Sequence, residues 1–153
     1  MQLFWKYTFL IFFVFGITGE LFSQSPEKKE LKALRIAEKP KIDGILNDSC
    51  WQQAAVATGF VQHEPLNGAE PTYQSVFKVA YNNNSIFIGA LLYDPEPEKI
   101  MRELGPRDSD DLNADAILVS FSPYNDGQNS FDFALYASGV QVDAKTFSGG
   151  DDI

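Results

Sequence analysis

The chain has 153 residues, of which 12 are basic and 21 acidic, and its net charge is −9. This length is enough for one domain rather than two. The acidic balance, with no run of basic residues, argues against nucleic acids and anionic lipid headgroups as partners. Cys50 is the single cysteine, so it cannot form a disulfide within the chain, and its apolar setting indicates a buried thiol.

The first residues have the order of a secretory signal peptide. Lys6 precedes a strongly apolar run at residues 7–18, and small and polar residues follow it. The run is too short to cross a bilayer as a helix, which takes about 20 residues; an uncleaved anchor is the alternative. We predict a signal peptide over residues 1–23 and hence an exported protein, located in the periplasm, in the outer membrane or outside the cell. Residues 24–33 are polar and charged, and we expect a linker there.

From Leu34 onward, short apolar runs alternate with turn residues, which is the pattern of an all-β protein. Asn82, Asn83 and Asn84 separate two runs, and Asp126-Gly127 separates two others, so both places are predicted hairpin turns. Strands spaced about ten residues apart indicate an antiparallel β-sandwich or barrel. The predicted strands are residues 34–38, 75–82, 85–93, 115–123, 129–137 and 140–146.

The last of these runs alternates between apolar and polar side chains, so one of its faces is predicted to be buried and the other wet. Its apolar face carries Val140, Val142 and Ala144, and its polar face carries Gln141, Asp143 and Lys145.

Two stretches are predicted to contain short helical turns. In residues 47–57, Ser49 and Gln52 have the spacing of a capping box. Trp51, Ala54 and Ala55 share one face of that turn. Residues 98–104 follow two prolines and could form one or two turns.

Trp51 has two interpretations. A large aromatic flanked by alanines on an amphipathic turn is first a packing signal, so we favour a core anchor over a platform for a ligand. Asp43-Gly44 precedes it and predicts a turn in which Asp43 accepts hydrogen bonds from nearby backbone groups.

Three segments resemble, in the same order, the family 9 carbohydrate-binding modules. The opening segment, "KPKIDGILNDSCWQQA", is the most specific of them. The others are "SVFKVAYNNNSIFIGALLYDPEP" and "DAILVSFSPYNDGQNSFDFALYASGVQVDA". The resemblance covers residues 34–153, and within the family it is strongest to the amino-terminal domain of large exported proteins of Gram-negative bacteria.

The resemblance implies a β-sandwich that binds glycans as an accessory to glycoside hydrolases in polysaccharide breakdown. It implies that a long β-rich domain follows. Sugar binders of the family clamp a sugar between two tryptophans, whereas the predicted mature chain has Trp51 alone, at the position of the motif's packing tryptophan. The single tryptophan favours a structural domain without sugar affinity, whereas the order of the three segments favours a non-catalytic binding module.

An acidic cluster at residues 105–116 could hold calcium, which takes six to eight oxygen ligands at about 2.3–2.6 Å. The candidate ligands are Asp108, Asp111 and Asp115. The family's structural calcium supports this assignment by resemblance. The alternative, which we favour from the residues, is a solvated loop in which Arg107 pairs locally.

Sugar recognition uses an aromatic face with planar polar side chains around it. Two predicted loops have these residue types. The candidate glycan contacts are Phe60, Gln62 and His63 in one loop and Tyr124, Asn125, Asp126 and Asn129 in the other.

Enzymatic chemistry is poorly supported by the sequence. The chain has no G-x-S-x-G motif for a serine nucleophile, and one histidine with one cysteine is too few for a zinc site. Pairs of carboxylates are guaranteed by chance among so many acidic residues. A hydrolytic domain is therefore the third hypothesis, after an exported carbohydrate-binding domain and a structural amino-terminal domain of a β-rich envelope protein without sugar affinity.

The number of predicted strands also suggests an incomplete sandwich, because two-sheet sandwiches have about seven or more strands. We expect the domain to continue beyond residue 153 with further strands. A missing strand would leave a central strand as an edge and expose apolar side chains such as Val140 and Val142.

Overall fold

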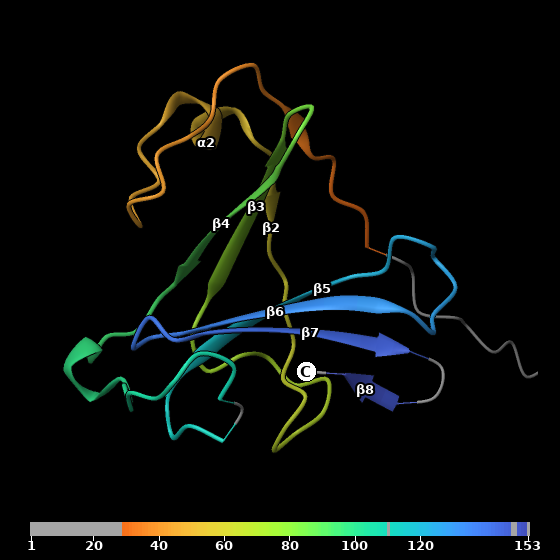
Figure 1. Cartoon of the computed structure of the whole chain (residues 1–153). Helices are drawn as coiled ribbons and strands as arrows, with labels where there is room; N and C mark the ends of the chain where they lie inside the picture. The colour runs from red at the N-terminus through yellow and green to blue at the C-terminus, as the bar shows by residue number, and fades with distance from the viewer. Residues whose placement is uncertain (1–28, 110, 148–149, 153) are drawn as a thin grey trace, which may run out of the picture. The chain divides into compact units, whose positions relative to one another are not determined.

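The computed structural model describes residues 29–109, 111–147 and 150–152 of the chain (Figure 1). Within these residues it contains eight strands in two sheets, one five-residue α-helix and one 3-10 turn. The prediction of an all-β protein is therefore confirmed. No helix in the described part of the chain has the length and apolar character needed to cross a membrane. The predicted signal peptide and the first residues of the predicted linker lie outside the described residues.

The first sheet is organised around β3 (Ser75–Tyr81), which pairs with each of the other three strands. These are β1 (Leu34–Arg35), β2 (Val56–Ala57) and β4 (Ile86–Leu92). Strand β1 is parallel to β3, with Leu34 opposite Ala80. The turn between β3 and β4 forms because Asn82 Oδ1 accepts hydrogen bonds from the backbone N–H groups of Asn84 and Ser85, both at 2.9 Å.

The second sheet is an antiparallel meander in the order β5-β6-β7-β8 (Figure 1). Its strands are β5 (Ala116–Phe121), β6 (Ser130–Tyr136), β7 (Gln141–Phe147) and β8 (Gly150–Asp152). All six predicted strands are present, with bounds that differ from the prediction by at most three residues. The short strands β2 and β8 were not predicted.

The chain divides into two compact units. One comprises Met1–Ala57 and Lys78–Gly89, and the other Thr58–Phe77 and Ala90–Ile153. The second sheet lies wholly in the latter unit. Most of the buried residues named below, including Trp51, lie in the former.

Trp51 anchors the core of the first unit. Its side chain is 2% exposed, and Ala54 and Ala80 are also buried. Gly89 on β4 leaves room for the ring, because a Cβ atom there would lie 3.2 Å from Trp51 Cε3 and 2.9 Å from Leu46 Cδ2. Lys78 Nζ donates a hydrogen bond to the backbone carbonyl of Trp51. The prediction of a core tryptophan is confirmed.

The segment before Trp51 is held by two aspartates. Asp43 Oδ1 accepts a hydrogen bond from Ile45 N at 2.9 Å, and Gly44 has a φ of 78°, a conformation that favours glycine. Asp48 Oδ2 accepts from Lys41 N at 3.3 Å. The predicted Asp43-Gly44 turn is confirmed.

The helical predictions need correction. The helix α2 spans Ser49–Gln53 and its N-cap is Asp48, whose side chain makes no capping hydrogen bond, so the capping box assigned to Ser49 and Gln52 is wrong. Asp48 has extended backbone angles, and its carboxylate is bonded to Lys41 N instead.

Three other details differ from the sequence analysis. Ala55 is exposed because the helix ends before it. Cys50 is half-buried rather than buried. The predicted helical turns at residues 98–104 are reduced to a single 3-10 turn, η1 (Pro97–Lys99), after which the chain becomes extended at Ile100.

We predict that Gly89→Ala lowers the free energy of unfolding by about 1–3 kcal/mol, the usual cost of overpacking a core. Chemical denaturation measures the change. In a Leu46→Ala background the same substitution should cost less, because the closest atoms have been removed. If the free-energy costs of Gly89→Ala and Leu46→Ala simply add in the double variant, the close packing of Gly89 against Leu46 and Trp51 is contradicted.

Candidate functional site

The register of the strands gathers three apolar side chains of β5 and three of β6 on one face of the second sheet. Residues directly opposite each other on antiparallel strands project to the same side. Ile117, Val119 and Phe121 of β5 lie opposite Leu135, Phe133 and Phe131 of β6, respectively. We call this side of the two strands the aromatic face; it consists of Ile117, Val119, Phe121, Phe131, Phe133 and Leu135.

The aromatic face is open along its middle strand. Phe131, Phe133 and Leu135 are 37%, 48% and 44% exposed, although β6 lies between β5 and β7. The rings of Phe121 and Phe133 pack edge to face with centroids 5.9 Å apart. Exposed apolar groups gathered on one side of a sheet are typical of a surface that packs against further protein or binds another molecule.

Polar side chains border this face on β7. Leu135, Phe133 and Phe131 are opposite Gln141, Asp143 and Lys145, respectively, so the three β7 side chains share the side of the aromatic face. We call them the polar row. Lys145 Nζ lies 5.7 Å from the centre of the Phe131 ring, within the range of a cation–π contact. Aromatic and polar groups are therefore direct neighbours across β6 and β7.

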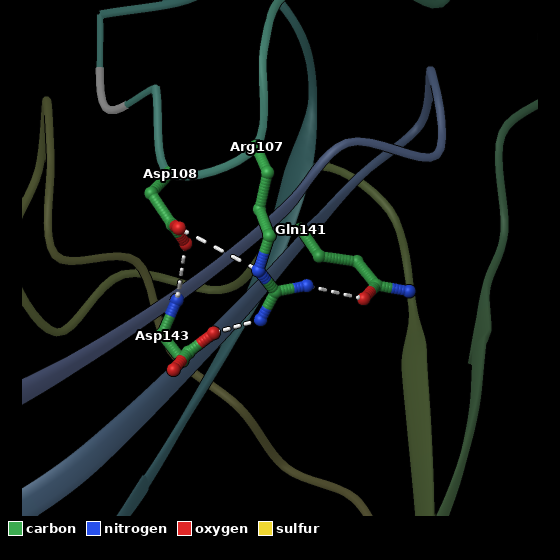
Figure 2. A network of polar contacts seen from close by, with 4 residues as sticks. All are labelled: Arg107, Asp108, Gln141 and Asp143. Atoms are coloured by element: carbon green, nitrogen blue, oxygen red, sulfur yellow. Dashed lines mark hydrogen bonds and ion pairs between the residues drawn. The ribbon is translucent and has the colours of Figure 1, made fainter.

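Arg107 contacts two members of the polar row, Gln141 and Asp143, and also Asp108 (Figure 2). Its guanidinium donates to Gln141 Oε1 at 2.9 Å, and it also donates to Asp143 Oδ1. Its Nε lies 3.5 Å from Asp108 Oδ2. Because one planar cation engages all three side chains, the amide of Gln141 and the carboxylate of Asp143 are held in position.

Asp108 protects the outer edge of β7 beside this network. Its backbone N–H donates to the carbonyl of Gln141 at 3.0 Å. Its Oδ1 accepts from Asp143 N at 3.3 Å (Figure 2). Its φ of 64° turns the chain so that both contacts are made. Strand β8 pairs with the rest of this edge, from Lys145 to Phe147. Protein groups therefore pair with this edge both at Gln141–Asp143 and at Lys145–Phe147.

This pairing corrects the expected exposure of β7. Val140 is buried and Val142 is half-buried, and β7 is not an unpaired edge strand. The predicted alternation of β7 is confirmed, since Val142 and Ala144 are less exposed than Gln141, Asp143 and Lys145.

The opposite face of the sheet contains a hydroxyl–carboxylate cluster. Asp132 on β6 accepts hydrogen bonds from Thr146 Oγ1 at 2.8 Å and from Ser130 Oγ at 2.9 Å. Hydrogen bonding from Ser120, Thr146 and Ser130, in decreasing order, lowers the pKa of Asp132 below its ordinary value. The ionised carboxylate thus joins three adjacent strands.

The predicted glycan contacts at residues 124–129 form the tip of the β5–β6 hairpin, which follows directly from the Phe121–Phe131 pair. Tyr124 is 71% exposed. Asp126 Oδ1 accepts from Gln128 N and Asn129 N at 2.9 and 3.0 Å. These bonds and the Asn129 side chain lower the pKa of Asp126, so the tip presents an ionised carboxylate beside Tyr124 and Asn125.

The other predicted loop uses its side chains internally. Phe60 packs against Phe77 with ring centres 5.2 Å apart. Gln62 Nε2 donates to the carbonyl of Glu70 at 2.8 Å. His63 is exposed in the same loop. Of Phe60, Gln62 and His63, His63 alone makes neither the ring contact nor the hydrogen bond just described. The tip of the β5–β6 hairpin is therefore the more open of the two predicted glycan-binding patches.

The predicted calcium ligands are not brought together as a metal site among the described residues, where no group of three or more His, Cys, Asp or Glu side chains is arranged to hold a metal ion. Asp108 instead contacts Arg107 and Asp143 N. The backbone of Asp115 bonds to Met101 and Ala137. Calcium binding through Asp108, Asp111 and Asp115 stays a prediction.

Sequence reasoning missed Phe131, Phe133 and Arg107 as candidate site residues. The period-two pattern of "SFDFALY" places both phenylalanines on one face, and that of "VQVDAKT" collects the polar row. Pairing the two strands across the turn at Gly139 would have predicted that the two phenylalanines and the polar row are neighbours. The contacts of Arg107 span 34 and 36 residues, and no local pattern predicts them.

Comparison with protein-family models, curated proteins and solved structures found no match to this chain. The resemblance to the family 9 carbohydrate-binding modules therefore stays a prediction based on the quoted segments.

We predict that Asp132 stabilises the fold only above its own pKa. A group whose pKa is lowered by folding adds stability above the unfolded value, about 3.9 for aspartate, and this contribution is lost as the pH falls through the folded value. Asp132→Asn should therefore melt at a lower temperature than the original chain at pH 7. The two melting curves should converge as the pH drops below about 4. A constant difference between pH 7 and pH 3 would contradict the role of the ionised carboxylate.

Proposed function

We propose that the chain is an exported, non-catalytic carbohydrate-binding domain that contacts its glycan on the aromatic face and the polar row. The observation that carries this proposal is the position of Phe131 and Phe133 directly beside Lys145 and Asp143. The C–H groups of a sugar ring pack against aromatic rings, and its hydroxyls bond to carboxylates and amides. Both kinds of group are present on neighbouring strands.

The restrained geometry of two members of the polar row, Gln141 and Asp143, supports the same function. Gln141 and Asp143 are exposed, yet Arg107 restricts their side chains before any ligand arrives. Groups that are already ordered lose less conformational entropy on binding. The open hairpin tip with Tyr124 follows the Phe121–Phe131 end of the face, and we include it as a flanking contact.

The proposal retains what the resemblance implies about context. The domain would be a β-sandwich that serves polysaccharide catabolism by associated glycoside hydrolases. It would precede a further β-rich domain, and it would act in the periplasm, in the outer membrane or outside the cell.

A structural domain without sugar affinity is the second candidate, and β5 is the observation that favours it. This strand lies at the outer edge of its sheet and carries no charged residue or proline, the usual protections of an edge. Leu118 on its other side is 66% exposed. In this alternative, further β-structure of a larger envelope protein would pack on the strand and on the aromatic face.

Affinity electrophoresis in gels that contain soluble polysaccharides tests the proposed function. Phe133→Ala should weaken retardation about fivefold to tenfold, because it removes one stacking ring worth about 1 kcal/mol or more. Leu118→Ala is the matched control, since it removes an exposed apolar side chain from the opposite face of the same sheet. It should leave retardation unchanged.

The structural alternative predicts a different result for the same proteins. If the aromatic face packs against other protein, no polysaccharide in a broad panel should retard the original chain. Phe133→Ala should then raise the fraction of monomer on size exclusion, because it reduces the exposed apolar surface. That pair of results would contradict glycan binding.

A further inference from the structure

The exposed apolar groups of the aromatic face form a line rather than a spot. Phe131, Phe133 and Leu135 occupy alternate positions on β6, so their side chains follow one another at about 6.8 Å along the strand. From the first to the last, the line is about 14 Å long, which exceeds one pyranose ring. All three are partly exposed, including the residues at both ends. A ligand that uses the whole line must therefore be extended.

Hydrogen-bonding side chains on β7 run parallel to this line of apolar side chains on β6. Each residue of the line has its own direct partner in the polar row on β7, from Lys145 through Asp143 to Gln141. A chain of linked sugar rings that lies along β6 would meet an apolar group and a polar group at each step. A single terminal sugar would use only one of these steps.

The charges on this surface disfavour an anionic chain. The guanidinium of Arg107 already pairs with the carboxylates of Asp143 and Asp108 and donates to Gln141, so its positive charge is offset before a ligand arrives. Lys145 lies against the Phe131 ring. The chain as a whole carries a net charge of −9 and would repel polyuronates at low salt.

We infer that the aromatic face binds the interior of a neutral, linear polysaccharide chain, which lies along β6 and needs no chain end. This inference rests on the proposed function and specifies its ligand. Binding along the chain makes affinity depend on the number of contiguous sugar rings, until the line from Phe131 to Leu135 is filled.

The ligand class is tested by affinity electrophoresis of the full chain with three probes. These are hydroxyethyl cellulose, the same polysaccharide after borohydride reduction of its ends, and polygalacturonate. We expect equal retardation by the first two, within about twofold, and at least fivefold weaker retardation by the third. Loss of binding after reduction, or preference for polygalacturonate, would overturn the inference while the proposed function stands. Absence of retardation by any glycan would overturn both.

The length of the line is tested by calorimetric titration with β-linked glucose oligomers of one to six units. Affinity should rise with length and then become constant. Phe131→Ala and Leu135→Ala, which shorten the line from opposite ends, should each move this plateau to a shorter oligomer, whereas Leu118→Ala should not. Phe131→Leu is the conservative variant if Phe131→Ala fails to fold. An unchanged plateau in folded variants at both ends would overturn binding along β6.

Discussion

The cross-strand register of β6 is the constraint on which the candidate site depends. Phe133 faces Val119 on one side and Asp143 on the other, and this triplet fixes every other pair in the sheet. A slip of one residue would move both phenylalanines to the face of Asp132. It would also bring Asp132 and Ser130 to the aromatic face and separate Asp132 from Ser120 on β5 and Thr146 on β7. The register thus decides which side chains are neighbours and, through them, which ligand the sheet can bind.

Features with local causes could be predicted from the sequence. Strands β6 and β7 follow from two-residue alternation, and the turns that join the two hairpins follow from Asn82 and from Asp126-Gly127. The buried position of Trp51 follows from its amphipathic spacing beside Ala54. In each case the deciding interaction lies within a few residues, so the local sequence contains the necessary information.

Features with distant causes could not be predicted. Asp48 rather than Ser49 is the N-cap, and its side chain does not cap the helix because its carboxylate bonds to the backbone at Lys41, seven residues away. The short strands β2 and β8 have too few residues for a period to be visible. Arg107 pairs with Gln141 and Asp143 because the chain returns to the edge of β7, which depends on the path of the whole meander. The polar half of the candidate site was therefore missed, although the predicted local pairing of Arg107 with Asp108 is present.

The most direct test of the central claim is a nuclear magnetic resonance titration of the isotopically labelled chain with a soluble β-glucan hexasaccharide. Residues on the two faces of one strand serve as internal reporters, because Ile117 and Val119 lie on the aromatic face and Leu118 lies on the other. The account predicts that the methyl resonances of Ile117, Val119 and Leu135 shift with the ring resonances of Phe131 and Phe133, while Leu118 stays unchanged. Shifts centred on Leu118, or none on the aromatic face at saturating ligand, would contradict it.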